Sequence, residues 1–440
     1  MKRFYCIASL MLAFTMSACG DDITEIQRPE GWGVDVGEEN IYGDIVVKDE
    51  SEPMAHPGCL HSAEDIARAK GKVAVGEAPW IDGWNKLIEN DHFRQDVSGN
   101  LPATTVFPNA TKKIIRGGNT IWESEPDNYN NAAQQAHAAY YYALAWKMTD
   151  DVKYAQAAVN ILNAWAETCT SINGDSNMSL AAGLYGYQFA NAGELLRDYE
   201  GWSVENFKAY QQWMVDVFYE ANNDFLVRHH NAAVGPLNYW ANWDLCNLAS
   251  MLSIGILADR RDIYNEAIEY LFEGEGNGNL NRTIVHVFDG EDEGLAQIQE
   301  SGRDQGHATL VVGLLGIIAQ TLWNQGDDLF GWNDNVILKA SEYAAKYNVA
   351  MLDVPFEPYT YYHNGGTSVL ETISADSRGT ARDMWEIFYN HYAKVKNVEP
   401  KWTQYTLLGV KSRQPEGATS VSTTGGGLDL LGMGTLMYAR

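Results

Sequence analysis

The chain has 440 residues, 45% of them hydrophobic, and a formal net charge of −27. This hydrophobic content is enough for a large core, so the composition excludes disorder for most of the chain. The acidic balance argues against non-specific nucleic-acid binding, which needs clustered Lys and Arg. The sequence therefore predicts a globular protein whose partners do not include nucleic acid.

Residues 1–18 predict an export signal. Lys2 and Arg3 precede an apolar run, Phe4–Met16, that is too short to span a bilayer as a stable helix. Small residues then lead into Cys19, a pattern that resembles the bacterial lipobox, whose cysteine is lipidated and becomes the mature N-terminus. A plain secretory leader is the alternative interpretation.

The stretch after the cysteine predicts a tether. Residues 19–50 are acidic and rich in Gly, with little periodicity, which is typical of a solvated linker. Residues 51–440 then form a single predicted domain. A lipid on Cys19 would place this domain at the outer membrane, on the periplasmic face or the cell surface.

The cysteines of the domain predict neither a metal site nor a disulfide framework. Cys59, Cys169 and Cys246 show no CxxC pair and no metal-ligand spacing. Small buried side chains are the simplest interpretation. We expect neither metal nor cofactor.

Helical periodicity dominates the domain up to about residue 400. Ser62 begins a capping box, and apolar residues recur at helical spacing in many later segments. No fixed-period repeat is present, which disfavours a regular solenoid. The pattern predicts an all-α fold, an (α/α) toroid or incomplete barrel of paired antiparallel helices. The segments are 132–148, 155–166, 180–197, 203–222, 244–258, 262–272, 303–323, 334–350 and 378–394.

Two segments depart from this pattern. The last forty residues are Gly-rich, and their short apolar stretches, 402–410 and 428–438, predict strands or extended segments packed on the helices. Residues 274–299 form a long polar stretch without helical periodicity. Loops of that length inside a compact domain are usually functional.

The densest polar cluster in the sequence covers residues 297–307. If a helix begins near Glu300, then Glu300, Arg303 and His307 share one face, at spacings of three and four. An Arg and a His oriented by a carboxylate suit binding an anion and moving a proton. The alternative is a buried polar network that ties one helix to another.

A second cluster, residues 238–244, lies at a loop-to-helix junction. It contains Tyr239, Trp240, Asn242, Trp243 and Asp244. Asn242 or Asp244 could serve merely as a helix N-cap. The two Trp rings could be platforms for sugars, because indole offers a flat apolar face with a polar edge.

Two weaker patches contain aromatic residues next to a histidine. Tyr361 belongs to the aromatic loop 359–365, and His391 ends a predicted helix, where it could simply interact with the helix dipole.

At this point the motifs resemble a known family. The chain resembles the toroidal alginate lyase superfamily, and most closely the polysaccharide lyases of family 38, over nearly all of the domain. The most specific match is Glu300-Ser-Gly-Arg303-Asp-Gln-Gly-His307. The others are His56-Pro57-Gly58, Phe189-Ala-Asn191-Ala, Asn242-Trp243-Asp244, Tyr389-Asn390-His391-Tyr392 and 432–436.

The resemblance implies an (α/α) toroid and cleavage of mannuronate- or glucuronate-containing polymers by β-elimination. Lyases of the superfamily use an Asn, often followed by His, to neutralise the substrate carboxylate. Here Trp243 follows Asn242, so Arg303 or His307 would complete the neutralisation.

The chemistry then assigns roles to side chains. Asn242 and Arg303 are expected on the carboxylate, His307 as base or neutraliser, and Tyr361 or Tyr239 as the acid that protonates the leaving oxygen. The expected substrate-binding residues are Asn191, Trp240, Trp243, Glu300, Gln305 and His391.

Two alternatives remain open from the sequence. A glycoside hydrolase on the same helical toroid would use two carboxylates, which Glu291, Asp292, Glu293, Glu300 and Asp304 could supply. A non-catalytic glycan-binding surface lipoprotein would also be helical and rich in Trp.

Overall fold

The computed structural model describes residues 41–231, 235–363, 366–379, 382–408, 414–417 and 428–440. The predicted export signal, Cys19 and most of the predicted tether lie outside these residues. So do the end of the 359–365 loop and part of the last forty residues.

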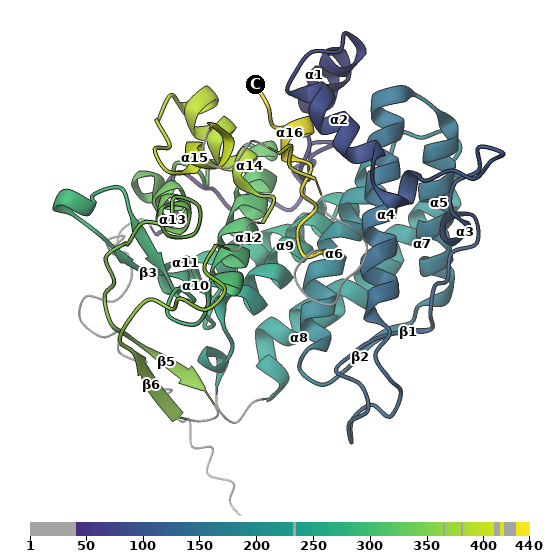
Figure 1. Ribbon diagram of the computed structural model, residues 1–440. Helices are drawn as coiled ribbons and strands as arrows, with labels where there is room; N and C mark the ends of the chain where they lie inside the picture. Colours follow the sequence, from purple (N-terminus) through teal and green to yellow (C-terminus); the bar gives the residue numbers. More distant parts are fainter. Residues whose placement is uncertain (1–40, 232–234, 364–365, 380–381, 409–413, 418–427) are drawn as a thin grey trace, which may run out of the picture.

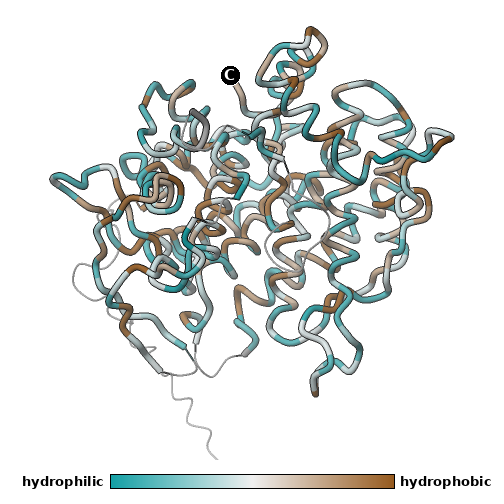
Figure 2. The backbone as a smooth tube through the Cα atoms, viewed as in Figure 1, coloured by the Kyte–Doolittle hydropathy of each residue, from teal (hydrophilic) through white to brown (hydrophobic). Residues whose placement is uncertain are grey.

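Helices in two layers make up the body of the molecule (Figure 1). The inner helices are α4 (Tyr129–Thr149), α6 (Met178–Leu195), α9 (Ala241–Leu257) and α12 (Gln305–Asn324), and each packs against the next. Figure 2 shows hydrophobic stretches on the helices in the middle of the molecule. The outer helices are α5 (Val152–Thr168), α7 (Val204–Trp213), α8 (Glu220–Arg228), α10 (Arg261–Glu273) and α13 (Trp332–Asn348).

This arrangement confirms the predicted (α/α) toroid. Each inner helix is followed along the chain by an outer one that returns in the opposite direction, as expected for paired antiparallel helices. Smaller helices cover the ends: α1 (Ala63–Ala74), α2 (Trp80–Ile88), α3 (Ala103–Val106), α11 (Leu280–Thr283), α14 (Trp385–Asn390), α15 (Thr403–Leu408) and α16 (Gly434–Met437).

Glycines allow α6 and α9 to approach closely. A Cβ at Gly183 would lie 2.4 Å from Cys246 Sγ, and one at Gly186 would lie 2.1 Å from Ser250 Oγ. Both helices are buried almost all round, which is the pattern of a helix in the centre of a core. The close packing of α6 on α9 therefore fixes the position of the N-terminal end of α9.

The domain begins earlier than the sequence predicted. Residues 41–50, assigned to the tether, pack on the helices: Ile45 is buried, and Lys48 forms an ion pair with Asp327. Trp332 Nε1 also donates a hydrogen bond to Ile41 O at 3.0 Å. The predicted boundary at residue 51 was wrong because an apolar anchor in an acidic stretch gives little periodic signal.

Three two-stranded sheets were not predicted. They pair β1 (Lys113–Arg116) with β2 (Ser171–Gly174) in parallel, and β3 (Ile284–Val287) with β4 (Ala296–Ile298) and β5 (Tyr359–His363) with β6 (Gly366–Leu370) antiparallel. Sheet pairing depends on a partner strand, so strands this short carry almost no signal of their own. The polar stretch 274–299 contains α11 and the β3–β4 pair.

The C-terminal segment closes the middle of the toroid. Backbone carbonyls of Leu428, Asp429 and Leu431 accept hydrogen bonds from side chains of α4 and α6. This extended packing confirms the prediction for residues 428–432. The prediction was wrong for residues 403–408 and 434–437, which are helical, and residues 382–384 of the expected helix 378–394 precede α14.

Candidate active site

The N-terminus of α9 is capped by side chains from another part of the chain. The Ala241 N–H donates to Gln299 Oε1 at 3.1 Å, and the Asn242 N–H donates to Glu300 Oε1 at 2.9 Å. Trp240 occupies the N-cap position, so neither Asn242 nor Asp244 is the N-cap. The carboxylate of Glu300 satisfies a free helix N–H and lies at the positive end of the helix dipole.

Arg303 joins this cap to the start of α12. Its Nη1 donates to Glu300 Oε2 at 2.9 Å, and its Nη2 lies 3.3 Å from His307 Nε2. Burial raises the pKa of Glu300, while the positive charge of Arg303 and the hydrogen bond from the Asn242 N–H oppose that rise. The structure thus brings together the three residues that the sequence placed on one face.

The reason for their proximity differs from the prediction. Glu300 and Arg303 lie in a turn, and α12 begins at Gln305, with Asp304 as N-cap. Asp304 Oδ1 accepts the His307 N–H at 2.9 Å. The expected helix from Glu300 was wrong because the N-cap carboxylate of Asp304 ends the turn, and the helix starts five residues after Glu300.

The hydrogen bonds assign the tautomer of His307. A guanidinium can only donate, so His307 Nε2 accepts from Arg303, and Nδ1 carries the proton. Nδ1 then donates to Asp304 Oδ2 at 2.6 Å. Burial acts to raise the pKa of Asp304, but the hydrogen bonds that it accepts from His307 lower it to about 2. The result is a neutral imidazole, fixed by an ionised carboxylate, with its basic nitrogen toward Arg303.

Two aromatic rings extend the cluster. The rings of Trp240 and Tyr361 stack with centroids 4.8 Å apart, and the guanidinium of Arg303 lies 5.0 Å from the Trp240 ring. Tyr361 comes from the β5–β6 hairpin and stacks on His363 as well. We call Trp240, Asn242, Glu300, Arg303, Asp304, His307 and Tyr361 the Arg303 cluster.

Asn242 brings an unused polar atom to this cluster. Its side chain is buried, and its amide oxygen has no hydrogen-bond partner. A buried amide without a partner costs free energy unless a ligand or solvent pairs with it. It lies one residue into α9 beside Glu300. The oxygen can only accept, so it suits a hydroxyl of a bound sugar, while the Nδ2 hydrogens are the donors that a carboxylate at Arg303 needs.

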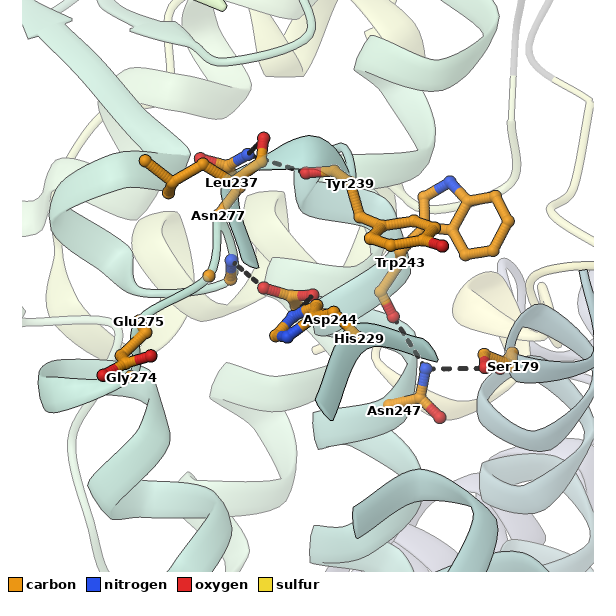
Figure 3. A network of polar contacts seen from close by, with 12 residues as sticks. Ser179, His229, Leu237, Tyr239, Trp243, Asp244, Asn247, Gly274, Glu275 and Asn277 are labelled. Atoms are coloured by element: carbon orange, nitrogen blue, oxygen red, sulfur yellow. Dashed lines mark hydrogen bonds and ion pairs between the residues drawn. The ribbon is translucent and has the colours of Figure 1, made fainter. Parts of the chain in front are cut away.

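A different network surrounds Asp244 (Figure 3). Asp244 Oδ2 accepts the Gly278 N–H at 2.8 Å and the Tyr270 hydroxyl at 3.2 Å, and Oδ1 lies 3.2 Å from His229 Nε2. Nearby, Asn277 donates to the carbonyls of Leu237 and Tyr239. We call His229, Asp244, Tyr270 and the 276–278 backbone the Asp244 cluster.

Tyr239 and Trp243 belong beside the Asp244 cluster. Their rings pack on each other with centroids 5.0 Å apart, and both pack on Phe225. Burial raises the pKa of Tyr239, and a hydrogen bond with Ser176 opposes the rise. Of the two tyrosines proposed as the acid, only Tyr361 contacts the Arg303 cluster among the described contacts.

Three predicted substrate-binding residues lie in the interior. Asn191 pairs its amide with Leu60 N and Tyr187 O, and Gln305 bonds to Ser301 O, Ser374 O and Asn348. His391 stacks on Phe330 with centroids 3.8 Å apart, and burial lowers its pKa to about 3. Their polar atoms serve packing, which corrects the prediction, although Gln305 supports the turn before His307.

Comparison with known proteins decides the family. The family model described as alginate lyase matches residues 91–353, more than half of the chain. The chain belongs to the alginate lyase family. The matched region contains Asn242, Arg303 and His307, while Tyr361 lies just beyond it.

Solved structures agree on the fold of this alginate lyase family member. Alginate lyase A1-III from Sphingomonas species A1 is 12% identical, with a TM-score of 0.53, and covers 89% of this chain and 98% of its own. A variant of A1-III in which one histidine is replaced by alanine, complexed with tetrasaccharide, has 12% identity, a TM-score of 0.55 and the same coverage. No curated protein matches the sequence. At this identity the likeness establishes the toroid and leaves residue roles to the geometry.

Two residues near the site were missed from the sequence. Arg382 donates to Gly306 O at 3.1 Å, next to His307, and forms an ion pair with Asp429 at 3.2 Å. Both are distant in the chain from residues 300–307, and no local motif marks them. Among the described residues, no group of three or more His, Cys, Asp or Glu side chains is placed to hold a metal.

Proposed function

We propose that this lyase cleaves a uronic-acid polymer, with polymannuronate preferred, by β-elimination at the Arg303 cluster. The observation that carries the proposal is the contact set of Arg303, with His307 on one nitrogen and Glu300 on another, beside the buried side chain of Asn242, whose Nδ2 hydrogens can donate. The related solved structures are alginate lyases, and alginate is a uronic-acid polymer that fits this chemistry.

The first requirement of the reaction is neutralisation of the sugar carboxylate. The C5 proton of a uronate is a poor acid while that carboxylate is fully ionised. Arg303 and the Asn242 amide would hold the carboxylate and stabilise the enolate-like charge that develops on it. One positioned donor of this kind is typically worth a factor of about 100 to 1,000 in rate.

The second requirement is a base for the C5 proton. His307 is neutral in the tautomer that Asp304 imposes, and Nε2 carries the lone pair. Its side chain is 39% exposed, so a substrate can reach it. Binding of the sugar carboxylate to Arg303 would take over the guanidinium contact and leave Nε2 free to accept a proton.

The third requirement is an acid for the leaving oxygen. Tyr361 stands over Trp240 at the edge of the cluster and is our candidate. In mannuronate and glucuronate the C5 proton and O4 lie on the same side, so His307 and Tyr361 would both act from that side of the sugar. In guluronate they lie on opposite sides, so the two side chains would have to flank the sugar.

The test is to incubate the purified domain with polymannuronate, polyguluronate and glucuronan while following ultraviolet absorbance. Elimination creates an absorbing unsaturated end, and we expect the fastest rise with polymannuronate. Arg303→Ala should lower kcat about 100- to 1,000-fold. Arg260→Ala, which removes a surface arginine paired with Asp262, is the matched control.

Three outcomes would contradict the proposal. Polymer shortening without an absorbance rise would indicate hydrolysis by two carboxylates. Binding of the polymers without any shortening would indicate a glycan-binding protein. Full activity in Arg303→Ala would show that the reaction takes place at another site.

We further propose that the protein is exported and anchored to the outer membrane through a lipid on Cys19. The support is the leader sequence alone, with its basic start, its apolar run and the small residues before the cysteine. Metabolic labelling with a radioactive fatty acid should mark the wild-type protein and not Cys19→Ala. Equal labelling of both would refute the anchor.

A further inference from the structure

Arg116 differs from the other arginines of the described chain in having no carboxylate or carbonyl partner. It ends strand β1, and its Nη1 is buried without a hydrogen-bond partner. Every other arginine among the described residues donates to a carboxylate or a backbone carbonyl. In a chain with a net charge of −27, an arginine that lacks an anion is unexpected.

Neighbouring aromatic side chains fix this guanidinium in place. It lies 4.9 Å from the centroid of the Tyr129 ring, at the start of α4. The positive charge of Arg116 opposes the rise that burial causes in the pKa of Tyr185 on α6. Burying part of a guanidinium without an anion costs free energy. A bound anion would recover that cost.

The position of Arg116 relates it to the Arg303 cluster through α9. Cys246 lies one helical turn after Asn242 and faces α6 at Gly183. Burial raises the pKa of Cys246, and the charge of Arg116 opposes that rise. Strand β1, which ends at Arg116, packs against α6, so Arg116 lies on the α6 side of α9.

The α12 side of α9 carries Arg303 and His307, and a chain of contacts connects the two sides. Asp429 accepts from Arg382, and Arg382 in turn donates to the carbonyl of Gly306. The Asp429 carbonyl also accepts a hydrogen bond from the Tyr187 hydroxyl on α6 at 2.7 Å. The two cationic positions thus flank the same end of α9.

We propose that Arg116 binds a second carboxylate of the polymer, on a sugar unit other than the one held by Arg303 and Asn242. Arg116 would then fix which bond of the bound polymer lies over His307. This inference rests on the proposed function and assigns Arg116 to substrate binding and positioning, without a part in proton transfer. A polyuronate carries a carboxylate on every unit, so two cationic positions on one cleaving domain match its chemistry.

The experiment compares Arg116→Gln and Arg116→Lys with the wild type on polymannuronate. Arg116→Gln should raise KM about 10- to 100-fold, the range expected for one lost charge-assisted hydrogen-bonded contact, and should change kcat little. Arg116→Lys keeps the charge but loses the planar guanidinium, so its KM should lie between those of the wild type and Arg116→Gln. Arg260→Gln is the matched control for removing one positive charge and should keep the wild-type KM.

Direct binding separates this inference from the proposed function. Calorimetry with a mannuronate oligomer should show weaker binding to Arg116→Gln than to the wild type, and a shallower dependence of binding on salt. The inference is overturned if Arg116→Gln binds the oligomer as the wild type does or keeps its KM. If the wild type releases no unsaturated product from any uronate polymer, the proposed function fails, and the calorimetric comparison still decides the role of Arg116. If Arg116→Gln does not fold, an unchanged KM in Arg116→Lys would likewise overturn it.

Discussion

The Arg303 cluster and the Asp244 cluster lie near the same end of α9 and contain the same kinds of side chain. Each pairs a histidine with an aspartate, His307 with Asp304 at 2.6 Å and His229 with Asp244 at 3.2 Å. Their exposure separates them, because the side chain of His307 is 39% exposed and that of His229 is 3% exposed.

The difference shows how a fold uses one chemistry for two purposes. In the Asp244 cluster both oxygens of the carboxylate are bonded by the protein, so the network joins α8, α9, α10 and the 276–278 loop. In the Arg303 cluster Asn242 keeps an unpaired amide oxygen, and Arg303 and His307 remain accessible. The first arrangement stabilises the fold and the second can bind a substrate.

The largest contrast is expected between the two histidines. His307→Ala removes the proposed base and should lower kcat about 100- to 10,000-fold with little loss of stability. His229→Ala removes a buried ring, so it should lower the midpoint of unfolding while kcat per folded molecule stays near wild type. Steady-state kinetics and denaturant unfolding of both variants measure this. Similar losses of kcat in the two would contradict the comparison.

The two tyrosines sharpen the same contrast. Tyr361→Phe keeps the stack on Trp240 but removes the proposed acid, and kcat should fall about 100-fold, the lower end of the range for proton transfer. Tyr239→Phe should change kcat by less than about threefold, since its ring packs on the Asp244 side. A kcat loss confined to Tyr239→Phe would reverse the assignment.

The two aspartates should separate stability from activity. Asp244→Asn cannot accept all three of the present hydrogen bonds, so we expect the free energy of unfolding to fall by about 2–3 kcal/mol. Asp304→Asn retains a good N-cap for α12 and should unfold like the wild type. Its kcat should fall about tenfold, because the imidazole loses the carboxylate that orients it. A lower stability of Asp304→Asn than of Asp244→Asn would contradict this separation of stability from activity.

The smallest effect concerns the N-terminal segment and pH. His56 Nδ1 lies 2.7 Å from Glu194 and Nε2 lies 2.8 Å from Asp259. Burial lowers the pKa of His56, but these hydrogen bonds outweigh it and raise the pKa from 6.5 to about 9. The pKa is higher in the folded state, so the stabilisation is complete below pH 6.5 and is lost as the pH rises through 9.

The matched variant for this effect is His56→Gln. We expect the wild type to exceed it in free energy of unfolding by about 1 kcal/mol at pH 6, because solvent screens this half-exposed pair. The gap should close by pH 10. A gap that does not change with pH would show that packing, and not protonation, provides the stabilisation.

Part of the site could be read from residues close together in the sequence. The spacing of Glu300, Arg303 and His307 placed them together correctly, although a turn capped by Asp304 replaces the expected helix. His391 and Asn191 were expected to bind substrate, but a polar residue inside a family motif can also stabilise the core, as these two do. No sequence pattern marked Arg116, since its proposed role follows from its lack of an anionic partner in the folded structure.

The sequence by itself determined the class of fold, because helical periodicity and caps are local. Ser62 caps α1 in a capping box, as predicted. Only the tertiary structure decided which tyrosine joins Arg303 and which arginine lacks a partner. Those facts depend on contacts between distant segments, and the packing of whole helices and hairpins fixes such contacts.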